Sequence, residues 1–193
     1  MFDCVILAAG AATRFGSCKM LANYCGQPLI TYALDAVQAL MPNKIILVTG
    51  AYRELVEKYC SHLQINNLQM VYSENWQLGM GHSLASGVEA LDNTTPLLIV
   101  LADQPKVSAK DLSKLVQLWK ENPTQIICAS FAGTLGVPSI FPAEFKTALK
   151  GCSGDRGAKQ ILLQHPDRVI SVPMPSAEFD VDTPQDLTRE FFA

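Results

Sequence analysis

Short apolar runs that alternate with helical stretches are the feature that most constrains the fold of this chain. The runs are strand-sized, and polar or turn-forming residues bound each of them. Because strands buried on both faces are nearly continuous in apolar residues, the pattern predicts a mostly parallel sheet with helices on each side. The predicted fold class is therefore α/β. The predicted strands cover residues 4–8, 44–48, 69–72, 96–101, 125–129 and 168–172. The predicted helices cover residues 28–40, 52–61, 80–92, 108–121, 155–164 and 184–191.

Length, composition and charge narrow the class of protein further. A chain of 193 residues with 49% hydrophobic and 17% charged residues suits one globular domain and excludes an intrinsically disordered one. The 15 Lys and Arg against 18 Asp and Glu give a net charge of −3, which offers no broad footprint for nucleic acid or an anionic membrane. We find no repeat or flexible linker, and Pro138 to Pro142 marks an irregular patch. We expect a single domain over residues 1–193, with neither nucleic acid nor membrane as a partner.

The six cysteines are widely spread along the chain. They form no CxxC pair, and no His lies at metal-ligand spacing beside any of them, so a zinc site is not expected. No basic and apolar signal sequence opens the chain, because Asp3 is already acidic, and the longest apolar runs are strand-sized. We expect a reduced, cytoplasmic protein whose cysteines mostly fill the core.

The loop that follows the first predicted strand combines small residues with two cations. It runs from Leu7 to Lys19. Small side chains let backbone N–H groups approach an anion closely, while Arg14 and Lys19 supply positive charge for phosphates. Gly10 and Gly16 are not followed by Lys and Ser in the Walker A register, and GxGxxG is absent. The loop predicts a triphosphate cradle of another kind. The alternative is an ordinary glycine-rich turn with two solvated cations.

Acidic residues follow the fourth predicted strand and recur near the C-terminus. Asp103 lies at the tip of a buried strand, where ligands of open α/β sheets gather, and Mg²⁺ prefers one or two carboxylates together with substrate phosphates. Ser108 is the better N-cap for the next helix, which leaves Asp103 available. Asp180 and Asp182 face the same side if their segment is extended. Thr183 with the proline after it is also a good helix start, so a structural interpretation stays open there.

Three motifs give the chain a family resemblance. The segment Leu-Ala-Ala-Gly-x-x-x-Arg-x-Gly-x-x-Lys, residues 7–19, resembles the signature of the nucleotidyltransferase superfamily that makes activated sugars, cytidyl-isoprenoids and dinucleotide forms of the molybdenum cofactor. Ala-Asp-Gln-Pro at 102–105 and Asp-x-Asp-Thr-Pro at 180–184 resemble the cytidylyltransferase branch, described as MobA-related or MocA-like. The guanylyl branch typically has Asn-x-Asn-Thr-Pro and Ala-Gly-Gly instead. The resemblance implies a three-layer Rossmann-like fold, with a nucleotide half at about residues 1–105 and an acceptor half at about 106–193.

The resemblance also implies roles for individual residues. Segment 74–84 resembles the loop that touches base and ribose, and segments 136–142 and 151–159 resemble the acceptor side. The plain alternatives are a glycine-rich helix start before Ser83, and a cap from Ser153 or Asp155 with solvated cations beside it. The implied catalytic residues are Arg14 and Lys19. The implied nucleotide-binding residues are Leu7, Ala8, Ala9, Gly10, Arg14, Lys19, Asn75, Gly79, Met80 and Ser83. The expected metal ligands are Asp103, Asp180 and Asp182, and the implied acceptor-binding residues are Asp155, Arg156 and Lys159.

The activity that the resemblance implies is transfer of CMP from CTP to the terminal phosphate of molybdopterin or the molybdenum cofactor, with Mg²⁺ and release of pyrophosphate. Ala9 in place of a glycine adds a methyl group where the base approaches, which favours cytosine by a graded amount. The alternatives are a guanylyltransferase and a sugar- or isoprenoid-phosphate nucleotidyltransferase. An alternative of another class is a non-catalytic partner that binds nucleotide or delivers the cofactor. The resemblance points to a molybdoenzyme or its chaperone as the protein partner.

Overall fold

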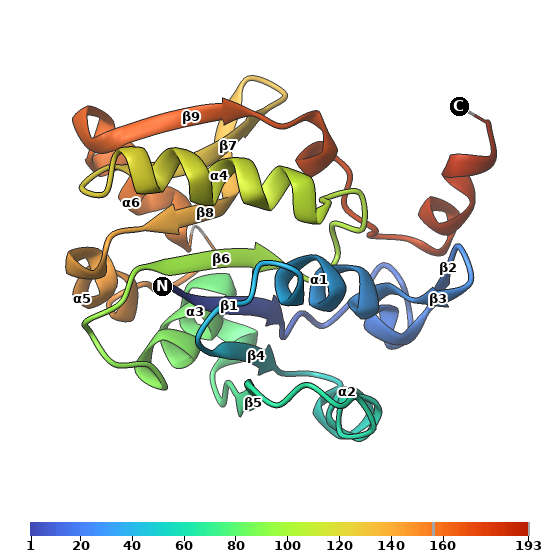
Figure 1. Cartoon of the computed structure of the whole chain (residues 1–193). Helices are drawn as coiled ribbons and strands as arrows, with labels where there is room; N and C mark the ends of the chain where they lie inside the picture. Colours follow the sequence, from blue (N-terminus) through green and yellow to red (C-terminus); the bar gives the residue numbers. More distant parts are fainter. Residues whose placement is uncertain (156, 193) are drawn as a thin grey trace.

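The computed structural model describes residues 1–155 and 157–192 and shows a seven-stranded sheet within them (Figure 1). The strand order is β5-β4-β1-β6-β8-β7-β9. The α/β prediction is confirmed, because helices cover both faces and every neighbouring pair is parallel except those that β8 makes. The strands are β1 (Asp3–Ala8), β4 (Ile45–Thr49), β5 (Leu68–Tyr72), β6 (Leu97–Leu101), β7 (Ile126–Phe131), β8 (Thr134–Phe141) and β9 (Val169–Pro173).

Alternation along the strands builds two cores, one on each face of the sheet. In β1, Cys4 and Ile6 belong to one core and Val5 and Leu7 to the other. Successive side chains of a strand point to opposite faces, so a strand this apolar needs a cover on each side. One face packs on α1 (Leu29–Gln38), α2 (Arg53–Cys60) and α4 (Ala109–Glu121). The other face packs on α3 (Met80–Glu89), α5 (Lys146–Lys150) and α6 (Ala158–Gln164).

Residues 138–142, which the sequence marks as an irregular patch, lie mostly in the interior strand β8, which was not predicted, and an irregularity does occur at Pro138. β8 lies antiparallel between β6 and β7. Its pairing with β7 shifts register between the Cys128–Ser139 pair and the Ala129–Gly136 pair, and Pro138 falls in that shift. Proline has no N–H for a strand ladder and is tolerated at such a bulge. The bulge therefore explains how a segment that contains Gly136 and Pro138, two residues that disfavour strands, still forms a strand.

The helices begin and end close to the predicted bounds, with differences near the C-terminus. The predicted cap at Ser108 is confirmed: Ser108 and Asp111 form a reciprocal capping box at the start of α4. Residues 184–191 were expected to be a helix and form the 3₁₀ segment Pro184–Phe192. Helix α5 and the short hairpin of β2 (Asn23–Tyr24) and β3 (Gln27–Pro28) were not predicted. Shorter 3₁₀ turns cover Lys19–Leu21, Trp76–Leu78, Ala143–Phe145, Pro166–Arg168 and Pro175–Glu178.

A third, small core fastens the C-terminal segment to the loop after β1. Phe15, Tyr24, Leu29 and Val181 form it, and Leu187 packs against it. Apolar contacts of this kind keep a segment without regular ladder bonds in one place. The residues around Val181 are thereby held beside the carboxyl ends of β1 and β6, although they come from the far end of the sequence (Figure 1).

The opposite end of the sheet contains a buried ion pair. Lys146 of α5 is fully buried, and its Nζ lies 3.2 Å from Oδ2 of Asp3 in β1. The same Nζ donates to the carbonyl of Asp92 at 2.6 Å and to Oγ1 of Thr95 at 3.1 Å, and the Thr95 hydroxyl also bonds Asp3. These contacts satisfy a charge that has no access to water. Among the described residues, no helix combines the length and apolar character that crossing a membrane requires.

Candidate active site

A cavity of about 430 Å³ opens at the carboxyl ends of β1 and β6. Its walls come from the loop after β1, from the region around the start of α3, and from acidic residues of the second half of the chain. This is the edge of an open α/β sheet at which ligands bind. The sequence-predicted residues that line it are Leu7, Ala8, Ala9, Gly10, Arg14, Lys19, Gly79, Met80, Ser83, Asp103, Asp155 and Asp182.

The loop after β1 is fixed by close backbone packing at its start and by a turn in its middle. Ala9 is buried, and its carbonyl oxygen accepts a hydrogen bond from Ala51 N at 3.3 Å. A Cβ atom on Gly50 would lie 2.2 Å from that oxygen, so only glycine allows the loop to pass there. Further on, the amides of Phe15 and Gly16 both donate to the carbonyl of Ala12 at 3.0 Å. The loop is thus held in one shape before any ligand arrives.

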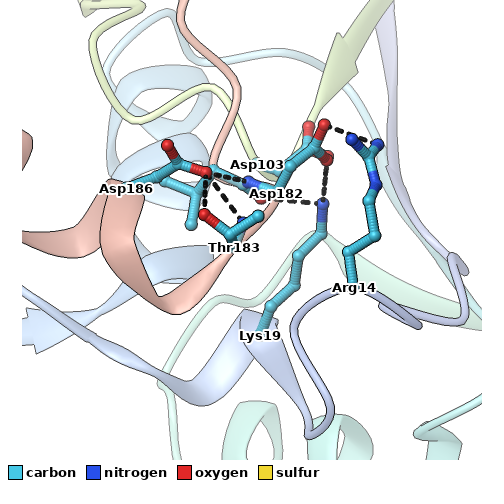
Figure 2. Close-up of polar contacts among 7 residues, drawn as sticks. Arg14, Lys19, Asp103, Asp182, Thr183 and Asp186 are labelled. Carbon is cyan, nitrogen blue, oxygen red and sulfur yellow. Dashed lines mark hydrogen bonds and ion pairs between the residues drawn. The ribbon is translucent and has the colours of Figure 1, made fainter.

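Lys19 lies at the centre of the site. Its Nζ donates to Oδ2 of Asp103 at 2.7 Å, to the carbonyl of Val181 at 2.9 Å and to Oδ1 of Asp182 at 3.4 Å (Figure 2). Burial by itself would lower the pKa of Lys19, but the charges of Asp103 and Asp182 outweigh it and raise that pKa. A permanently charged ammonium group therefore joins the end of β6 to the C-terminal segment.

Arg14 approaches the same carboxylate from the solvent side. Its Nη2 lies 2.8 Å from Oδ2 of Asp182, and 71% of the Arg14 side chain is exposed (Figure 2). Exposed pairs of this kind contribute little stability. The Arg14–Asp182 pair can therefore be broken at small cost, whereas three contacts hold Lys19 in place.

The acidic residues differ in how they face the cavity. Asp182 lines it and contacts both cations, while Asp180 is not among the lining residues. The carboxyl of Asp180 is crowded by protein although the residue as a whole is exposed. This burial and then the negative charge of Asp103 raise the pKa of Asp180 to about 6. The amide of Val181, between the two aspartates, donates to the carbonyl of Asp103 at 3.0 Å, which anchors their segment to β6.

Asp103 is one of the residues that could hold a divalent metal ion. Its Oδ2 bonds Lys19, while its Oδ1 is buried and has no hydrogen-bond partner in the described part of the chain. A buried, unsatisfied carboxylate oxygen is costly unless a ligand completes it. The same part of the chain contains no group of three or more His, Cys, Asp or Glu side chains placed to hold a metal by themselves. Two carboxylates, from Asp103 and Asp182, fit an ion that takes its other ligands from phosphates and water.

One residue of this network was not predicted as part of the site. Asp186 is buried, and its Oδ2 accepts hydrogen bonds from Asp182 N at 3.1 Å, Thr183 N at 2.8 Å and Thr183 Oγ1 at 2.8 Å (Figure 2). The sequence signal was present, because a Thr followed three residues later by an acid is a helix-start pattern. That pattern indicated only a cap and did not show that the capping acid would also hold Asp182.

The loop before α6 docks on the first turn of α3. Gly81 N donates to the carbonyl of Gly154 at 2.7 Å, and Gly154 N donates to Nδ1 of His82 at 3.3 Å. A Cβ atom on Gly81 would lie 2.6 Å from the backbone of Ser153, so this approach requires glycine. The docking brings Asp155 to the cavity wall. Neither Ser153 nor Asp155 caps α6, whose start at Gly157 has no side-chain cap.

Besides Asp180, two of the sequence-predicted site residues that the structure describes, Asn75 and Lys159, do not line the cavity. Asn75 is exposed and precedes the 3₁₀ turn at Trp76, which itself lines the cavity. Lys159 donates to Oγ1 of Thr134 at 2.6 Å, at the start of β8. Arg156 lies outside the described residues. Of the implied acceptor set, the structure therefore places Asp155 alone against the cavity, among the residues it describes.

Known proteins resemble this chain in sequence and in fold. Residues 4–169 match the MobA-like NTP transferase domain. Nicotine blue oxidoreductase of Paenarthrobacter nicotinovorans is 30% identical over 196 residues, covering 96% of this chain and 94% of that protein. Rv0371c from Mycobacterium tuberculosis H37Rv superposes with a TM-score of 0.82 at 24% identity, covering 100% of this chain and 98% of that one. A structure of the same protein in complex with manganese gives a TM-score of 0.75.

The molybdopterin-guanine dinucleotide biosynthesis protein A of Archaeoglobus fulgidus has the same fold. It superposes with a TM-score of 0.70 at 15% identity, covering 97% of this chain and 96% of that one. At such identities the structural likeness shows a shared Rossmann-like nucleotidyltransferase fold. The sequence match at residues 4–169 spans most of the chain and includes the cavity-lining residues except Asp182. The chain belongs to the family of MobA-like NTP transferase domains.

Proposed function

We propose that the protein transfers CMP from CTP to the terminal phosphate of molybdopterin or the molybdenum cofactor and releases pyrophosphate. The observation that carries the proposal is the buried Lys19, held between Asp103 and Asp182 at the foot of a small-residue loop. Fixed positive charge beside carboxylates in a cavity at the sheet edge suits a metal-bound triphosphate. The family membership supports nucleotidyl transfer.

The bond changes are simple. A terminal phosphate oxygen of the acceptor forms a bond to the α-phosphorus of CTP, and the bond from that phosphorus to the bridging oxygen of the β-phosphate breaks. The electron pair of that bond leaves with pyrophosphate. The attacking phosphate is already anionic at neutral pH, so the reaction needs no general base. Positioning and charge neutralisation are what the protein must supply.

The cations divide this work according to their burial. Lys19 is fixed by three contacts and holds the transferring end of the nucleotide in one place. Arg14 is exposed and exchanges Asp182 for the phosphates when the nucleotide arrives. Asp103 and Asp182 are the residues that would hold Mg²⁺, and Asp180 adds negative charge beside them. Bound there, Mg²⁺ would neutralise charge on the phosphates.

We assign the nucleotide and the acceptor to different halves of the chain. We place the nucleotide on residues 1–105 and the acceptor on residues 106–193, with Asp155, Arg156 and Lys159 on the acceptor side. The Asp-x-Asp motif and Ala9 favour cytosine over guanine. A methyl group changes selectivity by only about 1–3 kcal/mol, so the preference is graded. We further propose a cytoplasmic location, which the six free cysteine thiols support, and a molybdoenzyme or its chaperone as the recipient of the product.

The proposal is tested by incubating the protein with α-³²P-CTP, Mg²⁺ and molybdenum cofactor and measuring which product contains the labelled phosphate. The proposal predicts label in a cofactor dinucleotide and one pyrophosphate for each transfer. Transfer from GTP in preference to CTP would instead assign the guanylyl reaction. Transfer only to a sugar or isoprenoid phosphate would change the acceptor class. Tight nucleotide binding without any transfer to any acceptor would favour the non-catalytic carrier.

A further inference from the structure

We propose that Asp186 is a positioning residue, which fixes the backbone at Asp182 and so holds the Asp182 carboxylate between Arg14 and Lys19. The inference deepens the proposed function, because Asp182 is a proposed metal ligand. Asp186 itself does not line the cavity and is not assigned contact with a substrate.

One carboxylate oxygen of Asp186 accepts three hydrogen bonds. Its Oδ2 accepts from Asp182 N, Thr183 N and Thr183 Oγ1 at 2.8 to 3.1 Å, and the residue is only 6% exposed. Hydrogen bonds to an ionised carboxylate are stronger than those between neutral groups, and burial makes them costly to lose. The orientation of the peptide before Asp182 is therefore set by Asp186.

The backbone on both sides of that peptide is also fixed. Val181 N donates to the carbonyl of Asp103, and the carbonyl of Val181 accepts from Lys19 Nζ. The Asp182 side chain then extends toward Arg14 and Lys19, while its amide faces Asp186 (Figure 2). A metal ligand set by successive backbone anchors keeps its geometry when its cation partners change.

The plain alternative is that Asp186 only caps the 3₁₀ segment Pro184–Phe192. The chain contains a matched example of such a cap in Ser108 and Asp111, at the start of α4. There, Asp111 Oδ2 accepts from Ser108 N at 3.3 Å and from Ser108 Oγ at 2.8 Å, as Asp186 does from Thr183. The hydrogen bond from the preceding residue, Asp182, is the contact that reaches the active site, and it distinguishes the two acids.

The experiment compares Asp186→Ala and Asp186→Asn with the control Asp111→Ala. Hydrogen exchange measures protection of the Asp182 and Thr183 amides in the full-length protein without ligand. Electron paramagnetic resonance of free Mn²⁺ measures binding of Mn²⁺–CTP, a readout that does not depend on turnover. Urea unfolding of each variant reports the loss of stability.

We expect Asp186→Ala to abolish protection of both amides and to weaken Mn²⁺–CTP binding about tenfold, which corresponds to about 1.4 kcal/mol. Asp186→Asn keeps one acceptor oxygen and should bind more tightly than the alanine variant. Asp111→Ala should lose stability but bind as the wild type does. Unchanged amide protection in Asp186→Ala, or binding equal to that of Asp111→Ala, would overturn the positioning role. A wild-type protein that binds no Mn²⁺–nucleotide would refute the proposed function, while the hydrogen-exchange result would still decide whether Asp186 fixes Asp182.

Discussion

Lys19 and Lys146 are paired with aspartates at opposite ends of the sheet, and we expect opposite consequences for replacing them. Lys146→Met should greatly reduce the free energy of unfolding and leave the nucleotide site intact. Lys19→Met should cost less stability and abolish nucleotide transfer. The difference follows from how well solvent and other partners stabilise the aspartates that remain once each lysine is replaced.

The magnitudes follow from burial. The side chains of Lys146 and Asp3 are 0% and 3% exposed, so the variant leaves Asp3 charged and without water. Breaking such a buried pair costs about 3–5 kcal/mol. Around Lys19 the side chains of Asp103 and Asp182 are 21% and 38% exposed. Asp182 is partly solvated and keeps Arg14, whereas Asp103 loses the hydrogen bond to its Oδ2 beside an Oδ1 that is already buried, so we expect a cost of about 1–3 kcal/mol.

Urea unfolding followed by circular dichroism measures both losses under the same conditions, and fluorescence of the cavity-lining Trp76 follows nucleotide binding. Thr95→Val provides a milder change at the Lys146 end if Lys146→Met does not fold, because it removes one partner and retains the ion pair. A larger loss of stability for Lys19→Met than for Lys146→Met would refute this reasoning. So would normal nucleotide transfer by a folded Lys19→Met protein.

Three further predictions concern the docked loop, the base and pH. Gly81→Ala should weaken acceptor binding and cost about 1–3 kcal/mol of stability, because its Cβ would meet the Ser153 backbone at 2.6 Å; unchanged unfolding and acceptor KM would contradict this. Ala9→Gly should reduce the preference for CTP over GTP in competition assays by about 1–3 kcal/mol, and an unchanged ratio would remove the role given to that methyl group. Burial alone would raise the pKa of Asp111, but hydrogen bonds from Ser108 and Lys114 outweigh it and lower that pKa. The stability that Asp111 contributes is therefore present above the unfolded pKa, about 3.9, and is lost as pH falls through the lower folded value. The difference in unfolding free energy between Asp111→Asn and wild type should shrink steadily as the pH falls below about 3.9, and a constant difference would contradict this.

The sequence predicts those parts of the fold that local patterns of apolar and polar residues determine. Continuous apolar runs identified β1, β4, β6 and β7, because strands buried on both faces need such runs. Shorter apolar runs identified the edge strands β5 and β9, which are only partly buried. β8 was not predicted, because Gly136 and Pro138 interrupt its apolar pattern and its pairing with β7 depends on a bulge in β8 itself. A bulge depends on contacts between strands, which local periodicity does not encode.

The site was predictable where a motif follows a strand directly. The loop at residues 7–19 and Asp103 lie at strand ends, and the structure places them together. The alternation of Asp180 and Asp182 did not show which one faces the cavity, because the small core around Val181 sets that orientation. Lys159 bonds Thr134 on β8, a strand that was not foreseen, so its partner could not be anticipated either.

Pyrophosphate release with Mg²⁺ and molybdenum cofactor, measured for the wild type and for Lys19→Met with CTP, GTP, ATP and UTP in parallel, decides whether the buried lysine serves nucleotidyl transfer. We expect release by the wild type with CTP above the other nucleotides. We also expect a rate at least about 10²-fold lower in the folded Lys19→Met variant, because it loses a preorganised charge at the transferring phosphate. Equal rates in the two proteins, or no release by the folded wild type with any nucleotide, would contradict nucleotidyl transfer at this site.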